Sequence, residues 1–308
     1  MSFEPLYSTE LGNAFCADSL KFLPTLPDQS VDLVLTSPPY ALHFKKEYGN
    51  ADQHEYVDWF LPFAREIKRV LKPEGSFVLN VGGAWTPGAP VRSLYHFRLL
   101  LALCDELGFN LCQEFFWYNP AKMPAPAEWV NVRRVRVKDS VEYIFWLSPS
   151  KFPVANNSNV LQAYSKDMER LIKRGVKETR RPSGHAIKET FAADNGGSIP
   201  SNLIECGNNE SNSRYIKDSK KQGRKIHPAR FPAELPRFFM QFLTQPGDLV
   251  VDPFAGSNTT GFIAEQLGRK WISIEKSPEY AADSELRFSE ATEAVAEGQR
   301  TLFDLASV

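Results

Sequence analysis

Apolar residues follow two alternating patterns along the chain. Short, nearly uninterrupted runs rich in Val, Leu, Ile and aromatic residues predict strands that are buried on both faces, as in a parallel sheet. Longer stretches with apolar residues three and four positions apart predict helices that pack one face on that sheet. The expected strands are 14–17, 31–35, 76–81, 111–118, 140–147, 249–251 and 271–275, and the expected helices are 19–26, 54–71, 93–107, 232–243, 258–267 and 278–297.

This alternation predicts an α/β fold with a doubly wound, mostly parallel, seven-stranded sheet. Segments 111–118 and 140–147 are long and aromatic and are expected to form an antiparallel edge pair. From about 150 to 226 the strand signals fade, and Asn, Ser, Lys, Arg and Gly dominate. We therefore interpret 1–149 and 227–308 as two parts of one domain, with 150–226 inserted between them as a recognition region.

Charge is distributed unevenly, although the whole chain carries a formal net charge of only −1. Between 165 and 225 there are 14 Lys or Arg residues and 8 Asp or Glu residues, whereas 275–308 holds 3 and 8 respectively. A second basic cluster comprises Arg133, Arg134, Arg136 and Lys138. A basic middle region is typical of a protein with one surface that faces a polyanion. Solvated charged faces explain the same counts equally well.

Several classes of protein are disfavoured. The first five residues lack the basic and then apolar pattern of a signal peptide, and the apolar run 99–104 is too short to cross a bilayer, so a cytoplasmic protein is expected. The four cysteines have no CxxC spacing and no accompanying histidines, which predicts incidental thiols and no metal site.

A candidate cofactor loop follows the strand at 249–251. Asp252 ends that strand, Gly256 permits close approach of the backbone to a ligand, and a helix begins near Asn258. The dinucleotide fingerprint GxGxxG is absent, so the loop does not predict phosphate binding. Asp252 suits a positively charged group, and Glu275, 23 residues later, suits ribose hydroxyls. S-adenosylmethionine carries both groups, whereas a helix cap with a surface acid is the structural alternative.

A candidate chemical motif, Thr36-Ser37-Pro38-Pro39-Tyr40, follows the strand at 31–35. Consecutive prolines turn the chain rigidly away from the sheet. The Ser37 hydroxyl and the Pro38 carbonyl can both accept hydrogen bonds from an exocyclic amino group, which would draw its lone pair out of conjugation and make it more nucleophilic. Tyr40 is placed to stack on a base, an interaction of about 1–3 kcal/mol. The structural alternative is a simple proline turn.

The two motifs, and their order, resemble the permuted beta class of DNA amino-methyltransferases. The resemblance covers nearly the whole chain and implies methyl transfer from S-adenosylmethionine, with S-adenosylhomocysteine as product, to a base flipped out of duplex DNA. Serine at position 37 is the form usual in N4-cytosine enzymes. The catalytic residues implied are Ser37, Pro38, Pro39 and Tyr40. The cofactor contacts implied are Asp18, His227, Pro228, Asp252, Pro253, Phe254, Gly256, Ser257, Asn258, Thr259 and Glu275.

DNA contacts are expected from basic residues of the two charged clusters. These are Arg133, Arg134, Arg180, Arg181, His185, Lys220 and Lys221, with a structural role left open for His185. Most of them are expected to contact phosphates rather than base edges. Because each strand of a site is methylated separately, a monomer is expected, with a dimer left open. The resemblance also implies a place in a restriction–modification system.

Two positions depart from the pattern of the class. Many members have Gly where this chain has Asn258, but Asn tolerates left-handed backbone angles, so the loop is expected to be intact. Asn80 ends the strand beside the catalytic one, where a carboxylate would be able to relay a proton from Ser37. An amide cannot take that proton, which favours direct methyl transfer with the proton lost to solvent.

Four alternatives compete with this interpretation. A C5-cytosine enzyme requires a nucleophilic Cys, usually after Pro, and the chain contains no Pro-Cys pair. An N6-adenine enzyme is the nearest rival. An RNA or protein methyltransferase fits less well, because the basic insertion is large for a small acceptor. A non-enzymatic DNA-binding module would need neither the Asp252 loop nor Glu275.

Overall fold

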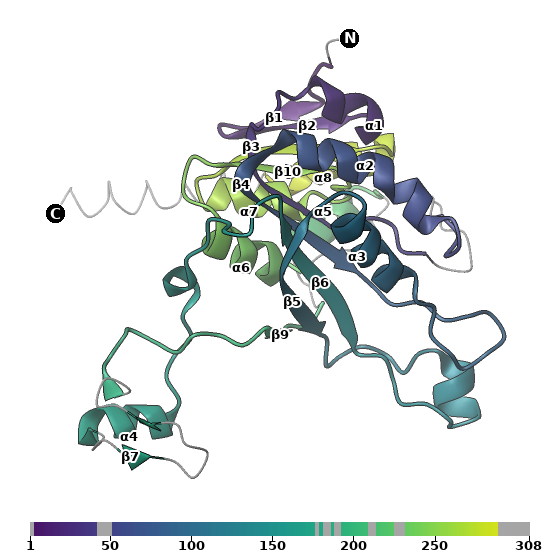
Figure 1. Cartoon of the computed structure of the whole chain (residues 1–308). Helices are drawn as coiled ribbons and strands as arrows, with labels where there is room; N and C mark the ends of the chain where they lie inside the picture. Colours follow the sequence, from purple (N-terminus) through teal and green to yellow (C-terminus); the bar gives the residue numbers. More distant parts are fainter. Residues whose placement is uncertain are drawn as a thin grey trace. The chain divides into compact units, whose positions relative to one another are not determined.

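A computed structural model describes residues 3–41, 51–175, 179–180, 186–187, 192–208, 214–224 and 232–288. Its main feature is a sheet in the order β1-β2-β11-β10-β3-β4-β6-β5-β9 (Figure 1). The strands are β1 (Tyr7–Ser8), β2 (Gly12–Cys16), β3 (Val31–Thr36), β4 (Leu71–Val81), β5 (Asn110–Tyr118), β6 (Val141–Ser148), β9 (Leu203–Glu205), β10 (Leu249–Asp252) and β11 (Lys270–Glu275). The helices of this domain are α1 (Ser19–Phe22), α2 (Tyr56–Val70), α3 (Tyr95–Asp105), α5 (Arg214–Lys221), α6 (Glu234–Leu243), α7 (Thr259–Gln266) and α8 (Pro278–Ser284).

The sheet is mostly parallel, as predicted. Strands β2, β11, β10, β3 and β4 run parallel to one another, and β6 pairs antiparallel with both β4 and β5. The expected antiparallel pairing of these two strands is confirmed, but the pair is not at the edge, because β9 pairs with β5 beyond it. The expectation of seven strands is wrong, because β1 and β9 extend the sheet at its two ends. These strands have only two and three residues, too few to produce a recognisable apolar pattern.

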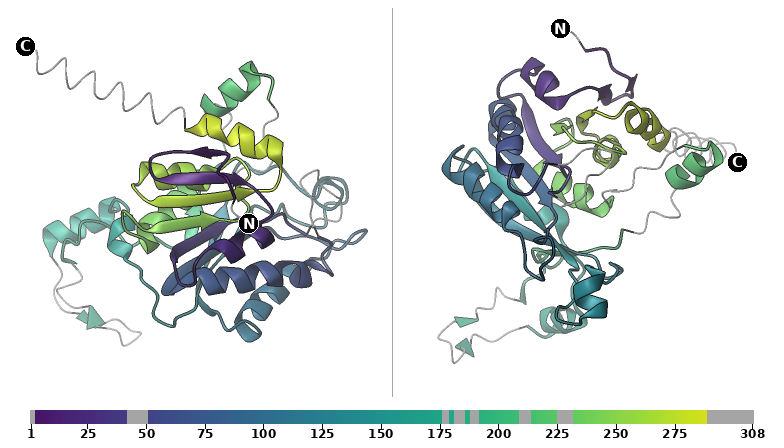
Figure 2. Two further views of the ribbon diagram at one scale, coloured as in Figure 1. Left: turned by 90° about the horizontal axis from the view of Figure 1, so that it is seen from above. Right: turned by 90° about the vertical axis from the view of Figure 1, so that its right-hand side faces the viewer.

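Helices cover both faces of the sheet. Helices α2 and α3 pack on one face, and α6 and α7 pack on the other, as the right-hand view of Figure 2 shows. Alternate residues of β3 contribute to the two layers: Val34 packs with Phe60 and Ile67 of α2, and Leu33 packs with Phe239 of α6. The uninterrupted apolar character of the parallel strands follows from burial on both faces.

Several element boundaries differ from those predicted, and the differences at β4 and α8 are the clearest. Strand β4 begins at Leu71, before the predicted start at 76, so Lys72-Pro73-Glu74-Gly75 belongs to the strand. Its pairing with β3 shifts register between Val31 and Leu33, which accommodates the proline. Helix α8 ends at Ser284 and continues as a single 3₁₀ turn over Glu285–Arg287. The expected helix 278–297 extends beyond the described residues.

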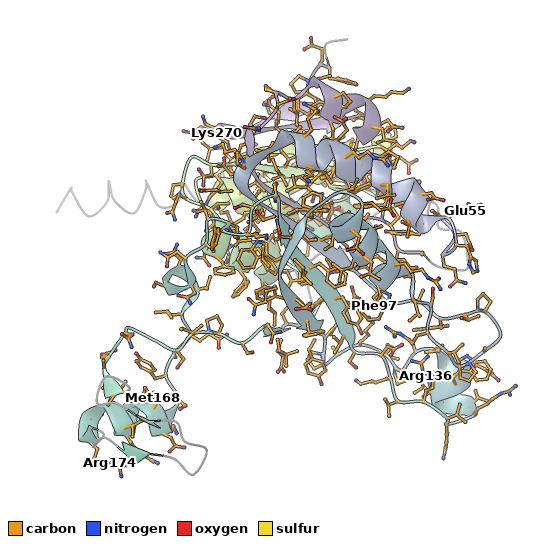
Figure 3. The ribbon with its side chains drawn as sticks, viewed as in Figure 1. Glu55, Phe97, Arg136, Met168, Arg174 and Lys270 are labelled. Atoms are coloured by element: carbon orange, nitrogen blue, oxygen red, sulfur yellow. The ribbon has the colours of Figure 1, made fainter. Side chains whose placement is uncertain are left out.

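The chain divides into two compact units, 1–154 with 202–308, and 155–201. The second unit contains a 3₁₀ turn at Asn157–Val160, helix α4 (Lys166–Arg174) and the short antiparallel pair β7 (Thr179–Arg180) and β8 (Ala186–Ile187). Met168 and Arg174 of α4 are labelled in Figure 3. A bridge between Gln162 and Ser198 joins the start of this unit to its end.

Three further observations concern the described part of the chain. None of its helices combines the length and apolar character that crossing a bilayer requires. All four cysteines are unpaired. The described residues contain no group of three or more His, Cys, Asp or Glu side chains placed to hold a metal ion.

Candidate active site

The two motifs lie at the carboxyl ends of neighbouring strands. Strand β3 leads into the proline motif and β10 leads into the Asp252 loop, and the two strands pair in parallel. The hydroxyl of Thr36 donates a 2.6 Å hydrogen bond to Oδ1 of Asp252, so the two segments are joined directly. In doubly wound sheets this edge is where ligands bind.

Tyrosine side chains of α2 and α3 fix the path of the proline motif. The Tyr56 hydroxyl donates to the Pro39 carbonyl at 2.9 Å, and the Tyr95 hydroxyl donates to the Gly82 carbonyl. The Tyr40 ring packs directly on Gly82, where an added Cβ atom would lie 2.3 Å from Tyr40 Cε2. Gly82 therefore leaves the space that the Tyr40 ring occupies.

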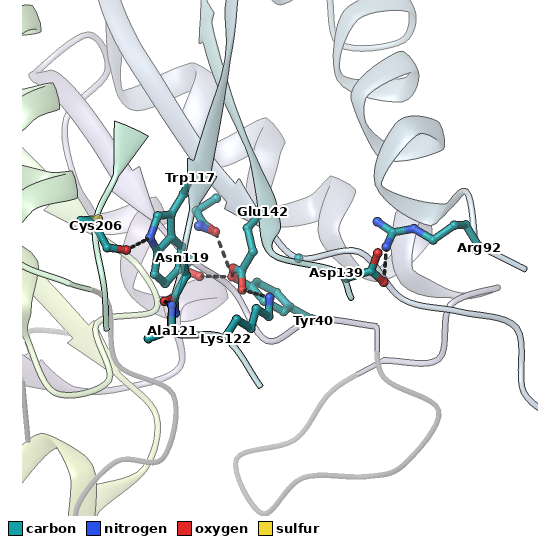
Figure 4. Close-up of polar contacts among 12 residues, drawn as sticks. Tyr40, Arg92, Trp117, Asn119, Ala121, Lys122, Asp139, Glu142 and Cys206 are labelled. Carbon is teal, nitrogen blue, oxygen red and sulfur yellow. Dashed lines mark hydrogen bonds and ion pairs between the residues drawn. The ribbon is translucent and has the colours of Figure 1, made fainter. Parts of the chain in front are cut away.

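The Tyr40 hydroxyl is the centre of a polar cluster (Figure 4). It lies 2.6 Å from Oε2 of Glu142, 2.9 Å from Oδ1 of Asn80 and 3.2 Å from Oγ of Ser37. The Lys122 ammonium donates to the other Glu142 oxygen at 2.8 Å. Burial, and then the negative charge of Glu142, raise the pKa of Tyr40 well above its ordinary value, so the phenol keeps its proton.

Glu142 was not identified from the sequence. The expectation of direct transfer, with the proton lost to solvent, considered only the amide at Asn80. Asn80 pairs with Ile144 of the antiparallel strand β6, which brings Glu142, near the start of β6, to the edge where β4 ends. The predicted antiparallel pair joined this strand only to β5, so it did not place Glu142 beside the end of β4.

Asp252 is buried, and protein groups already engage both of its oxygens. Thr36 and the Phe254 amide donate to Oδ1 at 2.6 and 3.0 Å, and Thr260 donates to Oδ2 at 2.6 Å. Burial raises the pKa of Asp252 to about 6, against the opposing effect of these donors. This carboxylate joins the end of β3, the loop and the first turn of α7, a role that the sequence did not predict.

Asn258 has the left-handed backbone expected for it, with φ 54° and ψ 41°. The side-chain carbonyl of Asn258 caps α7 by accepting from the Gly261 amide at 3.0 Å, and its side-chain NH₂ donates to the Tyr7 hydroxyl at 2.8 Å. The prediction that asparagine preserves the loop is confirmed. In the next position, the Thr259 hydroxyl is buried and has no hydrogen-bond partner among the described residues.

Two carboxylates end adjacent strands beside this loop. Glu275, at the end of β11, accepts from the Gly256 amide at 2.8 Å and from the Ser277 amide at 2.7 Å, and burial raises its pKa. Asp18 follows β2, caps α1 by accepting from the Leu20 amide at 3.0 Å, and lies 3.0 Å from the Lys276 ammonium. Both side chains are partly exposed and keep lone pairs for further donors.

The remaining expected cofactor residues support the loop. The Pro253 carbonyl accepts from Ser19 at 2.5 Å, and the Phe254 ring packs 4.9 Å from the ring of Phe63. Ser257 is tied to the guanidinium of Arg287, which donates to its carbonyl at 2.6 Å and to its hydroxyl at 3.0 Å. His227 and Pro228 lie outside the described residues.

The expected DNA-contacting residues are only partly described. Arg133 and Arg134 are exposed in the connection between β5 and β6, where Arg133 forms a 2.7 Å ion pair with Glu128. Lys220 and Lys221 are exposed in the last turn of α5. Only the backbone of Arg180 is described, in β7, and Arg181 and His185 lie outside the described residues.

The order of the site segments defines the class. The proline motif follows β3, near the start of the chain, and the Asp252 loop follows β10, near its end. Amino-methyltransferases with permuted motifs have their motifs in this order. The chain belongs to the N6/N4 DNA methylase family, whose model, described as DNA methylase, matches residues 31–286.

Known relatives agree with this assignment. The chain is 53% identical to the type II methyltransferase M.PvuII of Proteus hauseri over 288 residues, 92% of this chain and 86% of that protein. The solved structure of the PvuII DNA methyltransferase (cytosine-N4-specific) matches with a TM-score of 0.77 and 47% identity, covering 93% of this chain and 90% of that one. The Thermus thermophilus protein TTHA0409, solved in complex with S-adenosyl-L-methionine, shares the fold at 22% identity and a TM-score of 0.55, over 90% and 93% of the two chains.

Proposed function

We propose that this chain is the modification methyltransferase of a restriction–modification system, and that it transfers a methyl group to the exocyclic N4 of cytosine in duplex DNA. The observation that carries the proposal is the Ser37-Pro38-Pro39-Tyr40 motif at the carboxyl end of β3, in a chain 53% identical to a type II methyltransferase. Serine in place of aspartate at position 37 favours cytosine over adenine.

The target amine meets two acceptors. The Ser37 hydroxyl and the Pro38 carbonyl accept from the NH₂ group and localise its lone pair on nitrogen, which makes N4 a better nucleophile. Hydrogen bonds from its hydroxyl, together with Gly82 against one side of its ring, hold Tyr40 in place to stack on the base. The base reaches this site only after it leaves the duplex stack.

S-adenosyl-L-methionine, which supplies an electrophilic methyl group on sulfur, fits the loop after β10. Glu275 accepts from the ribose hydroxyls, and Asp18 lies near the adenine. The buried Thr259 hydroxyl, which has no protein partner among the described residues, is available to the ligand. Asp252 acts indirectly, by holding the loop, because its oxygens already accept from Thr36 and Thr260. His227 and Pro228, which lie outside the described residues, are assigned to the methionine part by the resemblance alone.

Basic residues hold the DNA. Arg133, Arg134, Lys220 and Lys221 contact phosphates together with Arg180, Arg181 and His185, and 150–226 supplies the sequence readout. The resemblance to the PvuII enzyme implies CAGCTG as the target. The enzyme acts as a monomer in the cytoplasm, on one strand of a site at a time, and sedimentation at micromolar concentration tests its oligomeric state.

One experiment tests the reaction, and a second tests the target. Purified enzyme is incubated with duplex DNA and S-adenosylmethionine, and the nucleosides are analysed by mass spectrometry. N4-methylcytosine is expected, whereas N6-methyladenine as the sole product would assign the enzyme to adenine. Plasmid from an expressing host should also resist the endonuclease that cleaves CAGCTG, and cleavage at every such site would reject this target.

A further inference from the structure

The buried hydroxyl of Tyr40 has more oxygen neighbours than it has protons. A phenol carries a single proton, yet the Tyr40 hydroxyl lies within hydrogen-bond distance of Glu142, Asn80 and Ser37. The carboxylate of Glu142 is the strongest acceptor of the three and also the nearest, at 2.6 Å. The Tyr40 proton therefore belongs to the bond with Glu142.

The other two neighbours must then donate to the phenol oxygen. The Ser37 hydroxyl can do so, since either oxygen of that 3.2 Å contact can be the donor. Asn80 can do so if its amide is turned about χ2, with its NH₂ directed at Tyr40. When Oδ1 faces Tyr40, Nδ2 of Asn80 is buried with no partner in the described part of the chain, and turning the amide gives it one.

This assignment produces a continuous chain of donors from Ser37 through Tyr40 to Glu142. The lone pairs of Ser37 Oγ remain available to the amino group of the base. At the far end, the Lys122 ammonium lies 2.8 Å from Oε1 of Glu142 and leaves Oε2 to the Tyr40 hydroxyl. The pKa of Tyr40 is raised, so the phenol does not ionise by itself and passes on one proton only as it receives another.

We propose that Glu142 receives the proton released by methylation, through Ser37 and Tyr40. The inference rests on the proposed function. As N4 attacks the methyl carbon and the carbon–sulfur bond breaks, the sulfur keeps the electron pair. One N4 proton moves to Ser37 Oγ, the Ser37 proton moves to Tyr40 Oη, and the Tyr40 proton moves to Glu142 Oε2. The sulfonium and the carboxylate are both neutralised, and Glu142 later returns its proton to solvent.

Glu142 does not touch the base, so it is a positioning residue that acts through Tyr40. Asn80 offers a way to separate this role from simple packing. Its side chain contacts the same phenol oxygen at 2.9 Å, so an aspartate at position 80 places a carboxylate within reach of Tyr40 from the neighbouring strand. A carboxylate at either position should complete the relay.

The test uses single-turnover rates of Glu142→Gln, Tyr40→Phe, their combination, and Glu142→Gln with Asn80→Asp. Glu142→Gln should slow methylation by about 100-fold, a usual size for a lost proton acceptor, with KM for DNA and calorimetric affinity for S-adenosylmethionine unchanged. Adding Glu142→Gln to Tyr40→Phe should slow it no further. Adding Asn80→Asp to Glu142→Gln should raise the methylation rate at least tenfold above that of Glu142→Gln alone. The matched control is Glu66→Gln, which removes a half-buried ion pair with Arg69 on α2 and should react like the wild type.

Several results would overturn the proposal. These are a Glu142→Gln rate within threefold of wild type, full additivity with Tyr40→Phe, or no restoration by Asn80→Asp in a folded protein. If Glu142→Gln does not fold, the solvent isotope effect on the wild-type enzyme tests the relay instead. Its chemical step should be slower in D₂O than in H₂O, and equal rates would reject the relay. Formation of N4-methylcytosine by the wild type separates this failure from failure of the proposed function.

Discussion

Glu142 and Asp252 are two carboxylates at the same edge of one sheet, with very different surroundings. Glu142 pairs with the Lys122 ammonium, accepts from a phenol, and its side chain is 15% exposed. Asp252 is 5% exposed, and its three donors are two neutral hydroxyls and one amide. The partial exposure of Glu142 gives a proton delivered by the proposed relay a route to solvent. A carboxylate enclosed by neutral donors mainly holds segments together.

The strongest test of this contrast is Asp252→Ala. The substitution leaves the Thr36 and Thr260 hydroxyls and the Phe254 amide without their acceptor, and it should lower the free energy of unfolding by about 4 kcal/mol. Urea unfolding of the protein without ligands measures this loss. Glu142→Gln should cost about 1 kcal/mol in the same assay, because its partners are closer to water. Equal losses for the two variants would remove the distinction.

A second test follows the pH dependence of Asp252. Burial raises its pKa from 3.8 to about 6, so between these values the folded state holds a proton that the unfolded state has released. The stability advantage of the wild type over Asp252→Asn is therefore full below pH 3.8 and lost as pH rises through 6. The change should be about 3 kcal/mol, measured by urea unfolding of both proteins across this range. A difference that stays constant with pH would contradict the assignment.

The opposite sign is expected near Glu142. His96 of α3 is fully buried beside Tyr143 of β6, and its ring nitrogens have no partner among the described residues. Burial, and then the charge of Arg92, lower the pKa of His96 from 6.5 to about 4. Stability relative to His96→Leu is therefore full above pH 6.5 and decreases by about 3 kcal/mol as pH falls from there through 4. A wild type that gains stability relative to this variant on acidification would refute the prediction.

The contrast also separates what the sequence could predict from what it could not. Strands β3, β10 and β11 are nearly continuous apolar runs, so their place in the sheet, and the loops after them, follow from local pattern. Asn258 was predicted correctly because left-handed backbone is a local property. Glu142 depends on the pairing of β4 with β6, whose joined ends, Val81 and Tyr143, are partners far apart in the sequence. Register between distant antiparallel strands leaves no local signal.

The role of Asp252 was missed for a related reason. Its position at a strand end is visible in the sequence, but its partners come from β3 and from the first turn of α7. A charged residue beside a ligand loop favours the interpretation that it binds ligand. Only the three-dimensional arrangement shows that protein donors already occupy its oxygens.

The return of the chain to the sheet at β9 has a consequence for how such enzymes change. Just before unit 155–201, Val154 donates to the Glu74 carbonyl, and just after it Asn202 bonds to the backbone of β5 at Glu114 and Phe116. Both ends of the excursion are thus fastened to the sheet independently of what lies between them. A lineage can exchange the intervening 47 residues, by recombination or gradual drift, while the catalytic edge stays intact. On the proposed assignment of 150–226 to sequence readout, new target sequences can arise in this way while the catalytic residues stay unchanged.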